Sequence, residues 1–287
     1  MSFAVFADGS ANLPGSMLAG ISLLPCTYTA GDQVITYHGN VDAFNGKEYY
    51  DTLRSGAVIK TSLLNTQLFL DHFGPVLKSG QDVIYISMSS GISGTYQAAT
   101  IAAGELLEEY PDRTLRIIDS HGCGFGSGLL AYHGAQLSRE GYSAKEAADI
   151  LDGEVPHMCQ YFTVDDLNFL KRTGRISGAS AMIGSVLNIK PLLYGTTDGN
   201  IVACAKCRGR KKAIEAMVEK YREKAVDPQH RVVCISHGDC EKDALLLAEK
   251  VRAVAEPGQL VICQHEPFSG AHVGPGMLSL FFYGTER

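Results

Sequence analysis

The sequence predicts an α/β protein of two domains, in which a parallel sheet forms the N-terminal domain and a smaller α/β domain follows. Three observations support this prediction. The chain has 287 residues, enough for two hydrophobic cores. Short apolar runs alternate with amphipathic stretches, and their pattern changes near Val155-Pro-His157. We therefore expect domains over residues 1–158 and 159–287.

The N-terminal domain is predicted to alternate strands with helices. The expected strands are Phe3–Ala7, Ile21–Thr29, Val83–Ser87 and Leu115–Ile118, and the expected helices are Ala43–Ser55, Asn65–Lys78, Gly94–Glu109 and Gly126–Glu140. Because helical crossovers join parallel strands, this alternation favours a parallel sheet that is covered on both faces.

The C-terminal domain shows the same alternation on a smaller scale. The expected strands are Gln160–Val164, Leu192–Tyr194, Ile201–Lys206, Arg231–Ser236 and Gln259–His265, and the expected helices are Asp165–Lys171, Gly209–Ala225 and Glu241–Ala255. This order indicates a second α/β core.

Loops that follow the predicted N-terminal strands are rich in glycine and hydroxyl side chains. They read Asp8-Gly-Ser10, Lys60-Thr-Ser62, Ser87–Thr95 and Asp119–Gly122. Ligands of parallel sheets bind at the carboxyl ends of the strands. Each loop precedes a helix, so we expect N–H and hydroxyl groups to converge on one rim that suits an anion.

The segment from Ser89 to Tyr96 carries the strongest of these signals. A strand is predicted to end at Ser87, and a helix to start near Gly94 with Ser93 or Thr95 at its cap. The alternative interpretation is a helix cap without a ligand. The same alternative, a turn or a cap, applies to Thr61-Ser62 and to Asp8-Gly-Ser10.

Two further features are candidates for contact with an anion. His272 is predicted to lie in a tight glycine-proline loop before the last strand, where it is poorly suited to core packing. Basic clusters occupy Leu170–Ser177 and Lys206–Lys212 in an acidic protein. They are either a solvated surface or a site that handles phosphate or an acidic partner.

Composition and motifs exclude several classes of function. The net charge of −6 argues against nucleic-acid binding. The N-terminus has no signal-peptide pattern, and no apolar run reaches the roughly 18 residues that span a bilayer, so we expect a soluble, cytoplasmic protein without stable membrane insertion. Only Cys204 and Cys207 have metal or redox spacing, without a second pair, so we expect reduced cysteines and no metal. The sequence contains neither a phosphate-binding loop nor the kinase signature set, so we expect that the chain itself does not bind ATP.

The motifs together resemble the DegV family, whose bacterial members include the FakB-type fatty-acid-binding subunits of fatty acid kinase. The resemblance spans nearly the whole chain and rests on several strings in one order. They are Asp8–Pro14, Thr61-Ser62, Ser89–Gln97, Asp119-Ser120, Asp166–Ser177, Leu187–Leu192, Asp198-Gly199, Arg208–Lys212 and His272–Gly276.

The resemblance implies a long-chain fatty acid as the bound ligand, with no other cofactor. Its carboxylate would be held by Thr61 and Ser93, with His272 close by and Ser62, Gly94 and Thr95 as further head-group residues. The N-terminal domain would carry these loops, and the C-terminal domain would complete an acyl tunnel.

The resemblance also implies a partner. A separate ATP-dependent kinase would convert the presented carboxyl group into an acyl phosphate, and Arg172 and Arg208 would help that kinase dock or handle phosphate. The chain would then be a lipid-binding protein and not an enzyme, and we expect a monomer.

An enzymatic alternative is a serine hydrolase of acyl esters that uses Ser93 and His272. The G-x-S-x-G motif is incomplete at Ser93, because Thr95 stands where its last glycine belongs. No third residue that orients the base can be identified by spacing. One departure from the DegV pattern lies nearby, since Leu63-Leu64-Asn65 replaces the usual Gln-Pro-Ser.

Overall fold

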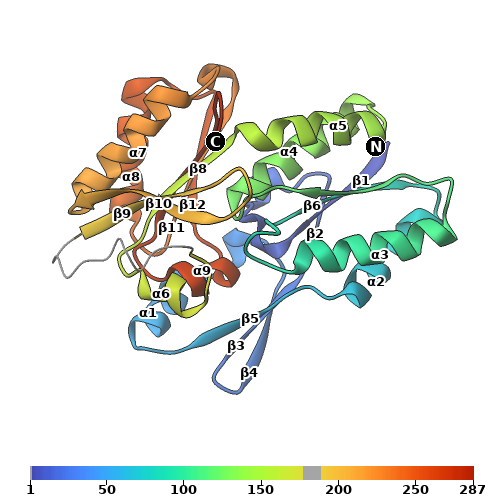
Figure 1. The fold of residues 1–287 in the computed structure, drawn as a ribbon, viewed down its shortest axis with the longest axis horizontal. Helices are drawn as coiled ribbons and strands as arrows, with labels where there is room; N and C mark the ends of the chain where they lie inside the picture. Colours follow the sequence, from blue (N-terminus) through green and yellow to red (C-terminus); the bar gives the residue numbers. More distant parts are fainter. Residues whose placement is uncertain (1, 177–188) are drawn as a thin grey trace. The chain divides into compact units, whose positions relative to one another are not determined.

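The computed structural model describes residues 2–176 and 189–287, and it confirms the predicted α/β class (Figure 1). The chain divides into two compact units. The first unit comprises Met1–Asp42 and Lys60–Val155, and the second comprises Ala43–Ile59 and Pro156–Arg287. The second unit thus includes residues 43–59, which precede the expected boundary at 158. That the N-terminal domain carries the head-group loops and the C-terminal domain completes an acyl tunnel stays a prediction.

The first unit is built on a parallel sheet with the strand order β2-β1-β6-β7. Its strands are β1 (Phe3–Asp8), β2 (Ile21–Leu24), β6 (Asp82–Ser87) and β7 (Leu115–Asp119). Its helices are α2 (Thr66–Lys78), α3 (Thr95–Glu109), α4 (Phe125–Glu140) and α5 (Ala144–Glu154). Figure 1 shows α4 and α5 over one face of this sheet and α2 and α3 over the other, as expected for a doubly covered sheet.

A smaller sheet with the order β4-β3-β5 corrects two predictions. It contains β3 (Cys26–Ala30), β4 (Gln33–Tyr37) and β5 (Ile59–Ser62). The strand expected over Ile21–Thr29 is two strands, because Pro25 separates β2 from β3 and cannot donate a backbone hydrogen bond. Residues 60–62, expected in a loop, lie in β5.

The second unit contains a mixed sheet with the order β10-β9-β8-β13-β11-β12. Its strands are β8 (Met158–Thr163), β9 (Ile189–Gly195), β10 (Ile201–Arg208), β11 (Val232–His237), β12 (Gln259–Gln264) and β13 (Leu278–Tyr283). Its helices are α1 (Gly46–Arg54), α6 (Asn168–Arg172), α7 (Arg210–Lys224), α8 (Glu241–Val254) and α9 (Pro267–Val273).

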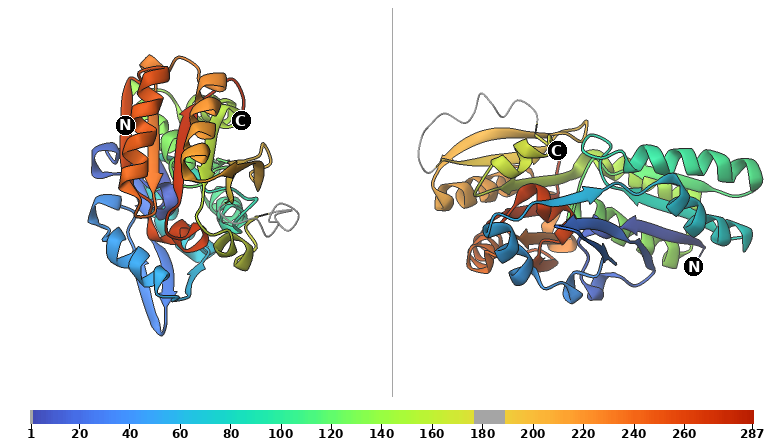
Figure 2. Two further views of the ribbon diagram at one scale, coloured as in Figure 1. Left: turned by 90° about the vertical axis from the view of Figure 1, so that its left-hand side faces the viewer. Right: turned by 90° about the horizontal axis from the view of Figure 1, so that it is seen from below.

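Two helices, α7 and α8, lie side by side along this sheet (Figure 2). The core beneath them is aromatic and aliphatic. Tyr221 of α7 meets Phe282 of β13 edge to face, with 5.2 Å between ring centroids. Five short 3₁₀ segments complete the described fold, at Gly9–Ala11, Gly15–Met17, Val41–Ala43, Val155–His157 and Pro228–His230.

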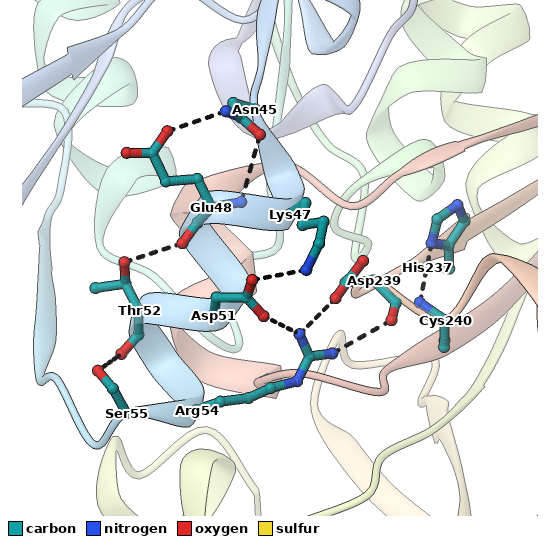
Figure 3. A network of polar contacts seen from close by, with 10 residues as sticks. All are labelled: Asn45, Lys47, Glu48, Asp51, Thr52, Arg54, Ser55, His237, Asp239 and Cys240. Atoms are coloured by element: carbon teal, nitrogen blue, oxygen red, sulfur yellow. Dashed lines mark hydrogen bonds and ion pairs between the residues drawn. The ribbon is translucent and has the colours of Figure 1, made fainter.

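Side-chain hydrogen bonds fasten α1 to the rest of the second unit. The hydroxyl of Tyr49 donates to the carbonyl of Pro267 at 2.6 Å, and that of Tyr50 donates to the carbonyl of His265 at 2.9 Å. Arg54 pairs with Asp51 at 2.8 Å and also with Asp239 (Figure 3). The helix predicted over residues 43–55 therefore exists, but it packs with the second unit.

Gly128 of α4 lies in close contact with a neighbouring backbone segment. A Cβ atom at this position would lie 2.3 Å from the carbonyl oxygen of Ala11. The close neighbour is the turn after β1 and not the sheet itself. No helix within the described residues is long and apolar enough to cross a membrane.

Candidate functional site

Three of the expected loops do meet at one edge of the parallel sheet. The register pairs Ala7 of β1 with Ile86 of β6, and Ser87 of β6 with Asp119 of β7. The three strands therefore end level with one another, as predicted. Because residues 60–62 belong to β5, they do not form a fourth loop of this kind.

Asp8 is a buried carboxylate at this edge. It accepts hydrogen bonds from the amide of Ser10 at 3.0 Å, the amide of Met88 at 3.1 Å and the hydroxyl of Tyr85 at 3.2 Å. The hydroxyl of Ser10 donates a further bond. Burial raises the pKa of Asp8, and these donors oppose that shift. The carboxylate thus ties the end of β1 to the start of the loop after β6.

Ser93 and Thr95 form a hydroxyl pair at the start of α3. The helix begins at Thr95 with Gly94 as its N-cap residue. The hydroxyl of Ser93 accepts from the amide of Thr95 at 3.2 Å and donates to the hydroxyl of Thr95 at 3.0 Å. Ser93 is half-buried, and Thr95 is buried. The N-cap residue is therefore Gly94 and not Ser93 or Thr95 as predicted, although the Ser93 hydroxyl does accept from the first amide of the helix.

The chain after β5 lies beside this hydroxyl pair. The amide of Leu64 donates to the hydroxyl of Thr95 at 3.4 Å. A Cβ atom at Gly94 would lie 3.3 Å from the Cδ2 atom of Leu63. Thr61 and Ser62 directly precede these residues in β5, where Thr61 is half-buried and Ser62 exposed. The structure therefore brings the segment that carries Thr61 next to the segment that carries Ser93.

His272 lies in the last turn of α9, so the prediction of a loop was wrong. Glu266 caps this helix by accepting from the amides of Phe268 and Ser269, and Pro267 occupies the first helical position. Burial, together with the positive charges of Arg175 and Arg172, lowers the pKa of His272 to about 4. The imidazole is therefore neutral near pH 7.

A buried hydrogen-bonded chain supports α9 from the sheet. The Nδ1 atom of His265 lies 2.9 Å from the hydroxyl of Ser236, and its Nε2 atom lies 2.7 Å from the hydroxyl of Ser269. Ser269 in turn donates to Glu266, and Ser236 contacts Ser279 at 2.7 Å. Burial lowers the pKa of His265 to about 3. This neutral, enclosed chain fixes α9 in place.

The predicted basic residues lie in the second unit. Arg172 ends α6 and stacks over the ring of Phe169, 4.8 Å from its centroid. Arg208 is exposed at the end of β10. Arg175 was not predicted as a site residue, although its effect on His272 places it nearby and the same motif contains it. Residues 177, 187 and 188 of the motifs lie outside the described residues.

A polar hollow lies along α1. A hollow of about 530 Å³ is lined by polar residues of α1 and its flanks, namely Asn45, Lys47, Glu48, Asp51, Thr52 and Ser55. Such walls do not suit an acyl chain. Within residues 2–176 and 189–287, no group of three or more His, Cys, Asp or Glu could hold a metal.

The hydrolase alternative finds little support at Ser93. A nucleophilic serine must donate its hydroxyl proton to a base. Within the described residues, the hydroxyl of Ser93 contacts the hydroxyl and the amide of Thr95, and neither of these groups is a base.

Comparisons with known proteins agree on one family. The family model of the uncharacterised DegV proteins matches residues 2–285. A DegV domain-containing protein of Clostridium perfringens is 36% identical over 286 residues, which cover 99% of this chain and 98% of that protein.

Solved structures of this fold include proteins described as fatty-acid binding. A DegV family protein of Thermus thermophilus, described by its fatty acid binding, is 25% identical with a TM-score of 0.88, over 99% of this chain and 100% of that one. DegV of Bacillus subtilis, described as a fatty acid binding protein, is 28% identical with a TM-score of 0.82, over 98% of each chain.

Proposed function

Because the chain belongs to the DegV family, we propose that it binds a long-chain fatty acid and holds the ionised carboxyl group with the hydroxyls of Thr61 and Ser93. The observation that carries this proposal is the hydroxyl pair of Ser93 and Thr95 at the start of α3, beside the segment that follows Thr61. A helix N-terminus and hydroxyl donors favour a carboxylate. Ser62 and Gly94, which are exposed, are further proposed contacts.

The acyl chain would supply most of the binding energy. Burying about fourteen methylene groups contributes on the order of 11 kcal/mol before the costs of association, at ~0.8 kcal/mol for each. Hydrogen bonds at the carboxylate then select an acid over other lipids. His272, neutral at pH 7, is proposed as a further donor, and no cofactor is needed.

We further propose that the bound carboxyl group is presented to a separate ATP-dependent kinase that forms an acyl phosphate. Arg172 and Arg208 support this step, because both are exposed guanidinium groups that suit an oxyanion or an acidic partner. On this proposal the chain alone, supplied with ATP and fatty acid, forms no acyl phosphate.

Titration with a fluorescent fatty acid tests the head-group site. We predict that Thr61→Ala and Ser93→Ala each weaken binding by about 1–3 kcal/mol, which is roughly 5-fold to 150-fold, because each removes a charge-assisted hydrogen bond. Thr100→Ala is the control, since this exposed threonine of α3 bonds only its own helix, at the carbonyl of Tyr96. Unchanged affinity in both site variants would exclude the proposed site.

The kinase step has a separate test. With a kinase partner and ATP, Arg172→Ala and Arg208→Ala are predicted to lower the rate of acyl-phosphate formation at least tenfold while affinity for the fatty acid is kept. Arg222→Ala on α7, whose residue pairs with Glu219, serves as the control. Equal rates for all three variants would count against this role.

A further inference from the structure

The loop after β6 is held from both sides by carboxylates of the neighbouring strands. In the order β2-β1-β6-β7, β6 lies between β1 and β7. Asp8 ends β1 and accepts from the amide of Met88 at 3.1 Å. Asp119 ends β7 and accepts from the amide of Ser90 at 3.1 Å. The first and third residues of the loop are therefore fixed by two different strands.

The rest of the loop is fastened by its own bonds and by the loop after β7. The amide of Ser89 donates to the carbonyl of Gly122 at 2.8 Å. The amide of Gly91 donates to the hydroxyl of Ser89 at 3.0 Å. The amides of Ile92 and Ser93 donate to the carbonyl of Ser89 at 3.3 and 3.2 Å. Asp119 also accepts from the amide of His121 at 3.0 Å.

Each amide from Met88 to Ser93 thus already has an acceptor within the scaffold. A ligand carboxylate must then find its donors beyond this point, at the hydroxyls of Ser93 and Thr95 and at the first turn of α3. Two acidic side chains so close to an anion site would disfavour the anion by charge repulsion alone. Asp8 and Asp119 can nevertheless favour binding of an anion if the order that they impose on the loop after β6 contributes more free energy than the charge repulsion costs.

We infer that Asp8 and Asp119 are positioning residues, which hold the loop after β6 so that Ser93 and the start of α3 discriminate a carboxylic acid from an uncharged head group. This inference rests on the proposed function. Neither residue needs to touch the ligand. Asp8 acts at the start of the loop through Met88, and Asp119 acts at its middle through Ser90.

The structure supplies a matched control at the opposite edge of the same sheet. Asp82 begins β6, and its carboxylate accepts from the amide of Thr114 at 2.9 Å. This is the same kind of contact, from a strand-end carboxylate to a backbone amide of a neighbouring segment. It lies at the amino end of β6, away from the loop that carries Ser93.

The experiment compares the affinity of palmitic acid with that of hexadecanol in the full-length protein. For the wild type and for Asp82→Ala, we expect the same preference for the acid. For Asp119→Ala and Asp8→Asn, we expect this preference to fall roughly tenfold, because the acid loses charge-assisted bonds that the alcohol cannot make as strongly. Asn suffices at position 8, because both oxygens of Asp8 accept hydrogen bonds and an amide keeps only one acceptor. Asp119→Asn keeps one oxygen acceptor, so its preference for the acid should lie between that of the wild type and that of Asp119→Ala. It replaces Asp119→Ala if the alanine variant does not fold.

The outcomes separate the inference from the proposed function. If the wild type shows no preference for the acid, the proposed function fails and the inference fails with it. If Ser93→Ala loses the preference while the Asp8 and Asp119 variants keep it, only the inference is overturned. An equal loss of preference in Asp82→Ala would also overturn the inference, because it would indicate general destabilisation. A stronger preference for the acid in Asp119→Ala would overturn it too, because charge repulsion would then be the dominant effect of Asp119.

Discussion

At the scale of single residues, the candidate site depends on which polar groups are charged. His272 and His265 are both held neutral by burial, with pKa values of about 4 and about 3. Asp8, in contrast, is buried among four donors that favour its charged form, although burial itself raises its pKa. Asp8 lies at the edge of the sheet that carries the Ser93 loop, where the hydroxyls of Ser93 and Thr95 are neutral donors for a carboxylate.

The neutral state of His272 predicts how stability depends on pH. Its pKa in the fold, about 4, lies below the ordinary value of 6.5. As pH falls below 6.5, the unfolded chain takes up the proton first, so the free energy of unfolding decreases until pH reaches about 4. This component is present in full above pH 6.5 and amounts to on the order of 1–3 kcal/mol.

Urea unfolding between pH 7 and pH 4 checks this prediction. His272→Gln should lose less stability over that interval than the wild type does. His230→Gln, at an exposed position, serves as the control. If wild type and His272→Gln show the same pH dependence, His272 does not titrate as described.

At the scale of elements, close packing at glycine fixes the position of α4. Gly128→Ala would place a methyl group 2.3 Å from the backbone oxygen of Ala11, which cannot move aside as a flexible side chain could. We expect a loss of about 2–4 kcal/mol in the free energy of unfolding. A Cβ atom at Gly104 in α3 would have no neighbouring atom within 4 Å. Gly104→Ala should therefore raise the free energy of unfolding, by at most about 1 kcal/mol. Denaturant titration of both variants measures the contrast, and a similar effect of the two would contradict it.

Several elements of the first unit lie close to the bounds that the sequence predicted. β1, β6 and β7 and helices α2, α3 and α4 lie within one or two residues of their expected bounds. Helix α5 was missed, although Ser143 and Glu146 form a capping box that marks its start. β4 was also missed, because its exposed positions weaken the apolar pattern.

The candidate site was predicted only in part, for physical reasons. The start of α3 near Gly94 follows from local chemistry, which the sequence displays, although Gly94 and not Ser93 or Thr95 is the cap residue. The placement of Thr61 in β5 depends on pairing with β3, and such pairing is not visible in a run of four residues. The helical setting of His272 was hidden by its flanking glycines, whereas Glu266 and Pro267, which start α9, were available as signals.

At the scale of the whole molecule, the second unit is assembled from two separate stretches of chain. Helix α1 joins residues 156–287 through Tyr49, Tyr50 and Arg54, although it precedes β5 in the sequence. A boundary drawn at one point in the sequence cannot describe such an arrangement. Thr61 follows the crossing from the second unit back to the first by two residues.

The anchoring of α1 yields a prediction of its own. Tyr50→Phe removes the buried hydrogen bond to the carbonyl of His265 and should lower the free energy of unfolding by about 1–2 kcal/mol. Tyr142→Phe is the control, because Tyr142 is 40% exposed. Thermal unfolding of both proteins makes the comparison, and an unchanged midpoint for Tyr50→Phe would show that this bond contributes nothing net.

We propose above all that the protein carries a free long-chain fatty acid, whose carboxylate is bound by the hydroxyls of Thr61 and Ser93. Native mass spectrometry of the purified protein, followed by lipid extraction, tests this most directly. We expect close to one unmodified fatty acid for each chain, and a large loss of it in the double variant Thr61→Ala, Ser93→Ala. A wild-type protein that carries no fatty acid and takes up none from solution would contradict it.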